Sequence, residues 1–196
     1  MRNLIELPAG VRPTLAIFAS DKGPGDAERA SIMSQVGTYF ARKGARIVCL
    51  AEGKSIAIPL VTSARAAGGE IIVISDEQFS LPRALAGVPL EQMADAEARH
   101  ARVAALADAF IGLPGSLASI SALYLSWLKA GGGPGGKPVV LYNRNKAFEV
   151  LRGYSADILA HSIPHHERLM QFADTVEDLW TRANRLAGEG RARQPG

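Results

Sequence analysis

The segment AFIGLPGSLASISALYLSWLKA, residues 109–130, has the pattern of an anion-binding turn. Residues 109–113 are a short apolar run, and Pro114 and Gly115 then break the chain. Apolar residues recur at helical spacing after Ser116, a residue type that caps helices. The first amides of such a helix carry partial positive charge and attract anions, most commonly phosphate, although an ordinary β-to-α turn has the same pattern. The candidate phosphate-binding residues are Gly115, Ser116, Leu117, Ala118 and Ser119.

Arg99 is a second group whose position could serve chemistry. It precedes Val103 by four residues and Leu106 by seven, so it falls on the apolar face of a predicted helix. A charge on such a face needs a partner or a pocket. A contact with a ligand and a long side chain that reaches the surface are both consistent with this position.

The elements that would position these groups alternate between strand and helix along the chain. The sequence predicts strands at residues 14–19, 45–51, 70–75, 88–93, 109–113 and 137–142, and a short extended segment at residues 169–173. It predicts helices at residues 27–43, 94–107, 146–160 and 175–187, one between Ser55 and Gly68, and one that begins near Ser116. This alternation predicts an α/β fold: a doubly wound, mainly parallel sheet with helices on both faces and right-handed crossovers.

Ligands of such sheets bind beyond the carboxyl ends of the strands. The loops at that edge are residues 20–26, 52–55, 76–83 and 114–119. Ser20 and Gly53 belong to the first two loops, and we add them to the candidate ligand-binding residues.

The composition fits one domain with a sizeable core. The chain has 196 residues, 47% of them hydrophobic, and a net charge of +3 from 22 basic and 19 acidic residues. We predict an N-terminal arm at residues 1–13, a single domain at 14–187 and a flexible tail at 188–196. The excess of basic residues is small and scattered, so we expect no nucleic-acid-binding surface.

Cysteine content and hydropathy bear on the compartment. The single Cys49 excludes an internal disulfide and is compatible with a reducing cytoplasm. No run approaches the roughly 20 apolar residues of a membrane span, and the N-terminus lacks the pattern of a signal peptide. We therefore expect a cytoplasmic protein that makes no membrane contact.

Four segments of the chain carry a family resemblance. They are RAAGGEIIVI at residues 65–74, ADAFIGLPGSLASISALYLSW at 107–127, KPVVLYN at 137–143 and HHERLMQFADTVEDL at 165–179. They resemble the LONELY GUY (LOG) family, often labelled "possible lysine decarboxylase", and the second aligns without gaps with that family's ADAFIALPGGxGTxxEL segment. The resemblance covers roughly residues 14–186 and implies a Rossmann-like fold and a homodimer.

The resemblance also implies an activity. Characterised LOG proteins cleave nucleoside 5′-monophosphates at the N-glycosidic bond and release the free base and ribose 5-phosphate. This reaction needs an acidic group that stabilises an oxocarbenium-like sugar or orients water, and a cradle that holds the phosphate. AEARHAR places Arg99 at the position of the family's arginine. The resemblance thus implies a nucleotide or another phosphate-bearing ligand, with Arg99 as a catalytic candidate.

The chain departs from the family at the positions that catalysis needs. PGGxGTxxE reads PGSLASISA at residues 114–122, so the family's glutamate is replaced by Ala122, which cannot hold a proton or stabilise a cation. GGGxxGLMG reads LAEGKSIAI at residues 50–58, without its three leading glycines. Glu52 in this segment is a second catalytic candidate because it could replace the lost acid, although a solvated turn residue fits the same position.

Other chemistry has less support. His161, His165 and His166 are close in sequence, but Pro164 breaks any shared helical face, and we expect no metal site. No lysine is distinguished as a Schiff base for pyridoxal phosphate, and we expect no cofactor. The serines of PGSLAS do not form the GxSxG pattern of a nucleophile.

Three functions remain open from the sequence. The first is a LOG-like nucleotide- or phosphate-ligand-binding protein with reduced or no phosphoribohydrolase activity. The second is an active hydrolase of an unusual nucleoside 5′-monophosphate that uses Glu52 or another carboxylate. The third is a structural or partner-binding dimer without a ligand. For a dimer interface we expect the helix after Ser116, including some of Leu123, Tyr124 and Trp127, because this helix is apolar over a wide arc.

Overall fold

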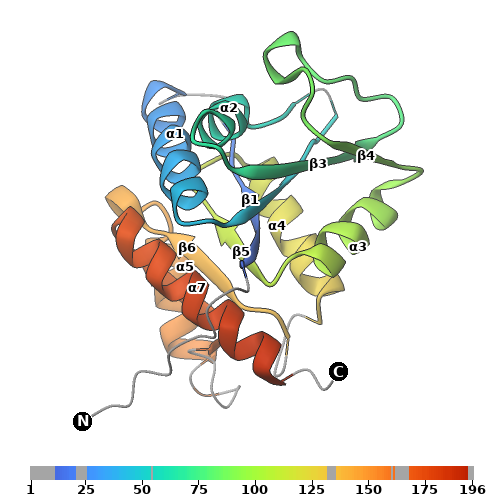
Figure 1. Cartoon of the computed structure of the whole chain (residues 1–196). Coiled ribbons are helices and arrows are strands. Elements are labelled where there is room, and N and C mark those ends of the chain that lie inside the picture. Colours follow the sequence, from blue (N-terminus) through green and yellow to red (C-terminus); the bar gives the residue numbers. More distant parts are fainter. Residues whose placement is uncertain are drawn as a thin grey trace.

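The computed structural model describes residues 12–20, 26–53, 55–131, 136–159, 161 and 168–193. Seven strands in this part of the chain form one sheet, and all neighbouring strands are parallel (Figure 1). The strands are β1 (Thr14–Phe18), β2 (Arg46–Leu50), β3 (Glu70–Asp76), β4 (Leu90–Met93), β5 (Ala109–Gly112), β6 (Val139–Tyr142) and β7 (Met170–Ala173). Their order is β4-β3-β2-β1-β5-β6-β7, so the chain winds outward from β1 in both directions and the predicted fold class is confirmed.

Helices cover both faces of the sheet. The long helices are α1 (Asp26–Arg42), α2 (Ile58–Ala66), α3 (Ala96–Leu106), α4 (Leu117–Lys129), α5 (Glu149–Tyr154) and α7 (Val176–Arg193). Shorter turns are η1 (Arg83–Leu85), η2 (Arg144–Lys146) and the π-helical η3 (Ser155–Leu159). Helices α1, α2 and α7 pack on one face, and α3 and α4 on the other (Figure 1).

The central strand β1 shows why the predicted strands are continuous apolar runs. Leu15 and Ile17 belong to the core beneath α1, α2 and α7, whereas Ala16 and Phe18 belong to the core beneath α3 and α4. Successive side chains of a strand point to opposite faces, and both faces are covered here. Apolar residues are therefore required at every position.

Close packing of α1 against α2 depends on a glycine. A Cβ atom at Gly37 would lie 2.5 Å from the carbonyl oxygen of Leu60 and still closer to the hydroxyl of Ser63. No real Cβ atom sits that close to a carbonyl, so only glycine allows the two helix backbones to approach this far.

The helix predicted at residues 146–160 is not a single helix. Asn145 and Lys146 have φ angles of 53° and 60°, which end η2, and α5 begins only at Glu149. The buried Asn143 side chain organises this break, because its Oδ1 accepts the amide of Phe148 at 2.7 Å. Local side-chain bonding of this kind competes with helix formation.

The last helix is longer than the sequence predicted. It continues past Ala187 to Arg193, so residues 188–193 are helical and not part of a flexible tail. Leu186 and Ala187 are buried in the core, and Arg191 pairs with Asp108 at 2.5 Å. These contacts fix the final turns to the sheet.

Several predictions fall on residues outside the described part: most of the N-terminal arm, residues 21–25, the glycine-rich residues 132–135 and the last residues, 194–196. Within the described part, none of the helices is both long and apolar enough to cross a membrane.

Candidate functional site

The carboxyl ends of β1 and β5 meet at the point where the order of the strands reverses. Phe18 of β1 is paired with Gly112 of β5, and the amide of Leu113 donates to the Phe18 carbonyl at 2.9 Å. A Cβ atom at Gly115 would lie 3.2 Å from the amide nitrogen of Ser20. The structure thus brings together two predicted site residues, Ser20 and Gly115, at the position where doubly wound sheets bind ligands.

The N-terminus of α4 is capped by its own serines. The Ser116 amide donates to Ser119 Oγ at 3.0 Å, the Ser119 amide donates to Ser116 Oγ at 3.4 Å, and Ser119 Oγ donates to the Ser116 carbonyl at 2.8 Å. This reciprocal arrangement is a capping box. The two hydroxyl groups are therefore engaged within the helix end.

Two backbone donors remain at this helix end. Among the described residues, no acceptor is bonded to the amides of Leu117 and Ala118. Both residues are exposed, Leu117 to 83%. The first turn of α4 can therefore offer unpaired amides and a partial positive charge to an anion.

Arg99 on α3 is largely but not fully buried, and it is held by a carboxylate that the sequence did not single out. Its Nη1 donates to Asp76 Oδ2 at 2.7 Å, and only 11% of the Arg99 side chain is exposed. The other oxygen of Asp76 accepts the amide of Gln78 at 3.0 Å. Arg99 therefore has a partner below the surface, and it does not extend into solvent.

Glu52 lies beside this pair, just past the end of β2. Burial raises the pKa of the Glu52 carboxyl, the positive charge of Arg99 lowers it in part, and the negative charge of Asp76 raises it further. Glu52 Oε1 and Arg99 Nε are buried, and neither has a hydrogen-bond partner in the described part of the chain. The two catalytic candidates, Glu52 and Arg99, thus belong to one cluster with Asp76.

Gly53 has a backbone role at the same edge. Its φ angle of 57° is in the left-handed region, which glycine adopts without strain. It forms the turn between Glu52 and Ser55, whose backbones exchange two hydrogen bonds of 2.9 Å each. This turn fixes where the Glu52 side chain leaves the backbone.

The position of the family's glutamate is part of the core. Ala122 on α4 is 4% exposed and packs with apolar side chains that include Leu123 and Phe110. The sequence indicated the cap at Ser116, because Pro114 and Gly115 break the chain just before it. It also indicated the buried face of α4, through the spacing of its apolar residues. Asp76 was only readable as the first residue of a loop at the carboxyl edge, without any motif around it.

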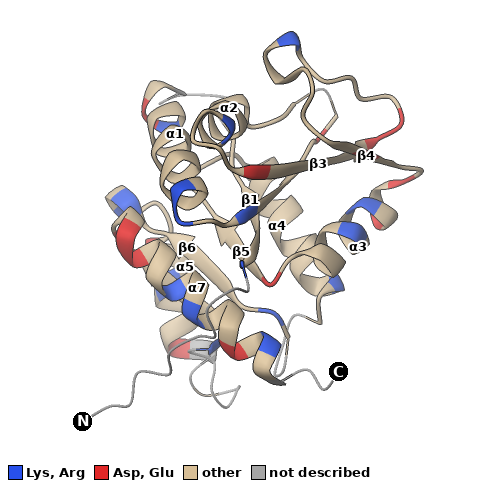
Figure 2. Ribbon diagram, viewed as in Figure 1, with Lys and Arg blue, Asp and Glu red and all other residues tan. Residues whose placement is uncertain are grey.

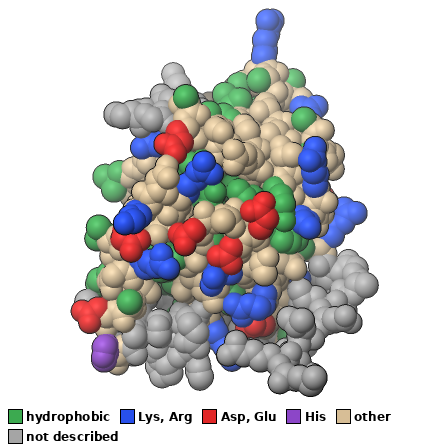
Figure 3. All heavy atoms as spheres, turned by 90° about the vertical axis from the view of Figure 1, so that its left-hand side faces the viewer, with side chains coloured by type: hydrophobic (Ala, Val, Ile, Leu, Met, Phe, Trp, Pro, Cys, Tyr) green, Lys and Arg blue, Asp and Glu red, His purple; other side chains and the backbone are tan. Residues whose placement is uncertain are grey.

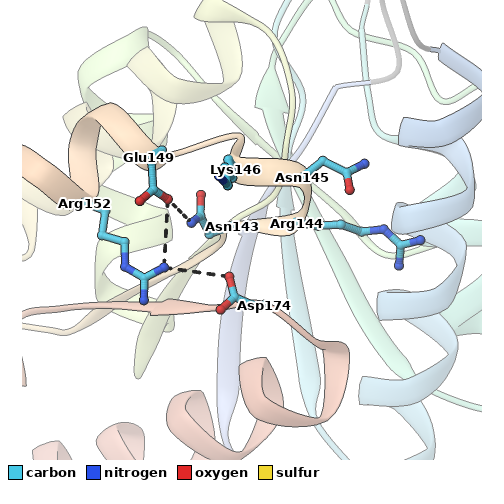
Figure 4. Close-up of a pocket in the computed structure, with 7 residues that line it drawn as sticks. All are labelled: Asn143, Arg144, Asn145, Lys146, Glu149, Arg152 and Asp174. Carbon is cyan, nitrogen blue, oxygen red and sulfur yellow. Dashed lines mark hydrogen bonds and ion pairs between the residues drawn. The ribbon is translucent and has the colours of Figure 1, made fainter.

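A separate pocket lies beyond the ends of β6 and β7. It has a volume of about 510 Å³ and is lined by Asn143, Arg144, Asn145, Lys146, Glu149, Arg152 and Asp174 (Figure 4). Figure 4 shows Arg152 directed between Glu149 and Asp174, at 3.9 and 4.0 Å, and Asn143 bonded to Glu149 at 2.8 Å. Arg152 thus lies between the two acidic residues of the lining, and none of the predicted site residues lines the pocket.

Charges are mixed on the surface. Basic and acidic residues alternate along α7 (Figure 2), where Asp178 pairs with Arg182 and Glu189 with Arg185. The face in Figure 3 shows the two signs interspersed without a broad basic area. Among the described residues there is no group of three or more His, Cys, Asp and Glu that could hold a metal ion, and His161 is exposed.

Known structures share this arrangement of strands and helices. The chain is similar to TM1055, with a TM-score of 0.64 and 17% identity, over 88% of this chain and 99% of that one. It is also similar to the Moco carrier protein from Chlamydomonas reinhardtii, with a TM-score of 0.65 and 18% identity, over 91% of this chain and 99% of that one. The fold is LOG-like and Rossmann-like.

A third similar structure is the molybdenum cofactor binding protein from the phototrophic bacterium Rippkaea orientalis. It has a TM-score of 0.62 and 17% identity, over 90% of this chain and 98% of that one. No protein-family model and no curated protein sequence matches the chain. At these identities the similarity concerns the fold, which is the level at which the resemblance to LOG proteins is confirmed.

Proposed function

We propose that the protein binds a nucleotide or another phosphate-bearing small molecule at the carboxyl edge of β1, β2, β3 and β5. The observation that carries this proposal is the partly buried cluster of Arg99, Asp76 and Glu52, in which two buried polar atoms lack partners in the described part of the chain. Buried polar atoms without partners are rare in stable proteins and cluster at sites that bind something.

The first turn of α4 supports a phosphate at one end of this site. The amides of Leu117 and Ala118 supply donors, and Gly115 keeps the turn close to Ser20 in the loop that follows β1. Arg99 adds a positive charge at the same edge of the sheet, and Asp76 fixes its orientation. Two of the similar structures are of proteins that carry or bind the molybdenum cofactor, which agrees with a ligand-binding use of this fold.

Catalysis is expected to be weak or absent. Ala122 replaces the acidic group that the LOG reaction needs, and it is buried among apolar side chains. Glu52 is the carboxyl group that an active hydrolase would have to use, and its raised pKa would suit an acid that donates a proton. An active hydrolase of an unusual nucleotide is therefore the second candidate function.

Calorimetry with Arg99→Ala tests the binding proposal. We expect the wild type to bind at least one of AMP, CMP and GMP, and Arg99→Ala to bind at least tenfold more weakly. Arg102→Ala is the matched control, because Arg102 is on the same helix but pairs with Glu91 at the surface. No binding by the wild type, or an equal loss in the control, would contradict the proposal.

Measurement of released free base separates the two candidate functions. A binding protein without hydrolase activity releases no free base during incubation with these nucleotides. If the wild type releases the base efficiently and Glu52→Gln does not, the protein is a hydrolase and the assignment as a binding protein without activity is wrong.

Assembly is a separate question, and we propose a homodimer through α4 and α5. Of the side chains expected at this interface from the sequence, Tyr124 is exposed, whereas Leu123 is buried in the core. The large exposed apolar side chains are Leu117, Tyr124, Leu125 and Leu128 on α4 and Val150, Leu151 and Tyr154 on α5. Helix α4 carries no charged residue before Lys129 (Figure 2). An uncharged helix with exposed leucines is suited to pack against the same helix of a second copy of the chain.

A further inference from the structure

Glu52 and Arg99 offer one unsatisfied acceptor and one unsatisfied donor. Glu52 Oε1 and Arg99 Nε are buried, and the described residues provide a hydrogen-bond partner to neither. The two groups influence each other electrostatically without bonding to each other. A molecule that bonds to both would supply what the described chain does not.

The cluster has a defined order of hydrogen-bonding groups. Asp76 accepts a bond of 2.7 Å from Nη1 of Arg99, and Nε of the same guanidinium has no partner among the described residues. Glu52 as a carboxylate offers two acceptor oxygens side by side, and Arg99 offers only donors. The side chain of Arg99 is 11% exposed and Glu52 is partly exposed, so the cluster reaches the surface.

We propose that the ring of the ligand carries a 2-amino lactam edge, which Glu52 and Arg99 recognise; this rests on the phosphate site proposed above. Such an edge presents an amino group and a ring N–H, both donors, and then a carbonyl acceptor. The two donors match the Glu52 carboxylate, and the carbonyl matches the Arg99 guanidinium. Guanine and pterin rings have this edge.

Adenine does not fit the same groups. Beside its amino donor it presents a bare ring nitrogen, and a carboxylate oxygen facing that nitrogen would meet a lone pair. Hypoxanthine keeps the ring N–H and the carbonyl but lacks the amino group, so it can satisfy only one oxygen of Glu52. The expected order of affinity is therefore guanine, then hypoxanthine, then adenine.

The distance to the α4 amides agrees with one ligand that spans both ends. Glu52 follows β2, and Gly115 follows β5, with β1 between these two strands. Neighbouring strands are about 4.8 Å apart, so the two strand ends are separated by about 10 Å. This is about the span of a nucleoside monophosphate from its phosphate to the far edge of its base.

Calorimetry with GMP, IMP and AMP tests the assignment of the ring. We expect GMP to bind at least tenfold more tightly than AMP, with IMP between them. Glu52→Gln replaces one acceptor oxygen by a donor amide and should remove most of this preference while AMP binding persists. Glu97→Gln on α3 is the control, because Glu97 is exposed and pairs with Lys129 at the surface.

The outcomes separate this inference from the proposed function. If the three nucleotides bind equally and Arg99→Ala still weakens their binding, the assignment of a lactam edge is overturned and the proposed binding site stays in place. A preference for GMP that Glu52→Gln does not change would also overturn it. Absence of binding by all three would overturn both proposals.

Discussion

At the scale of single residues, Cys49 is the simplest group to test. It is buried at the centre of β2, and burial raises the pKa of its thiol to about 12. A thiol reacts as the thiolate, so Cys49 is expected to be inert at pH 8. Labelling with a thiol reagent should be negligible in the folded protein and complete in urea. Rapid labelling without denaturant would mean that β2 opens readily.

His100 makes stability depend on pH. It is 6% exposed, with Nδ1 at 2.9 Å from Ser126 Oγ, and burial lowers its pKa, as do the positive charges of Arg99 and Lys129. The folded protein therefore favours the neutral ring. Stability is at its full value above the unfolded pKa of about 6.5, and it falls as the pH drops from there through the lower folded-state pKa.

Urea unfolding of His100→Gln between pH 5 and 8 measures this contribution. The variant is expected to lose less free energy of unfolding across that interval than the wild type, since glutamine does not titrate. Comparing the dependence on pH, rather than absolute stability, removes any packing change that the substitution itself causes. Parallel curves would contradict the assignment to His100.

The sequence predicted only those parts of the candidate site that depend on local backbone preferences. Ser116 as a cap and Gly115 in the turn follow from local residue preferences, and the structure has both. The partner of Arg99 could not be predicted, because Asp76 is 23 residues away and meets it only after β3 and α3 have packed. Binding of a phosphate by the Ser119 hydroxyl stays a prediction. The hydroxyl would have to give up its bond to the Ser116 carbonyl in order to donate to the phosphate.

At the scale of elements, the contact between α1 and α2 gives a matched pair of substitutions. Gly37→Ala should lower the free energy of unfolding by about 1–3 kcal/mol, because the added methyl group meets the Leu60 carbonyl. Gly190→Ala in α7 meets no atom within 4 Å and should stabilise the protein by up to about 1 kcal/mol. Chemical denaturation measures both. A stable Gly37→Ala would mean that the helices separate easily.

The elements themselves were largely predictable, since each predicted strand is present and the short extended segment at residues 169–173 forms β7. Apolar periodicity and glycine breaks fix such elements locally. The exceptions are helix ends that depend on contacts made by other residues after folding. Asn143 breaks the helix predicted at 146–160, and Asp108 extends α7 by pairing with Arg191.

At the scale of the whole molecule, the exposed leucines of α4 predict a dimer that charge can separate. Leu125 and Leu128 are each 46% exposed. Replacing both by glutamate should convert a dimer into a monomer in light scattering, because burying two charges without partners is costly. Gln35→Glu on α1, which covers the opposite face of the sheet, should leave the mass unchanged. A wild-type monomer at high concentration would rule out the dimer.

The place of β1 between β2 and β5 has a consequence for synthesis on the ribosome. Leu15 is paired with Ala109, and Asp108 accepts the amide of Thr14 from 94 residues away. At about 5–20 residues per second, one edge of β1 waits roughly 5–20 s for its second neighbour. The apolar nascent chain is exposed for that time, so shielding by a chaperone should raise the yield most when translation is slow.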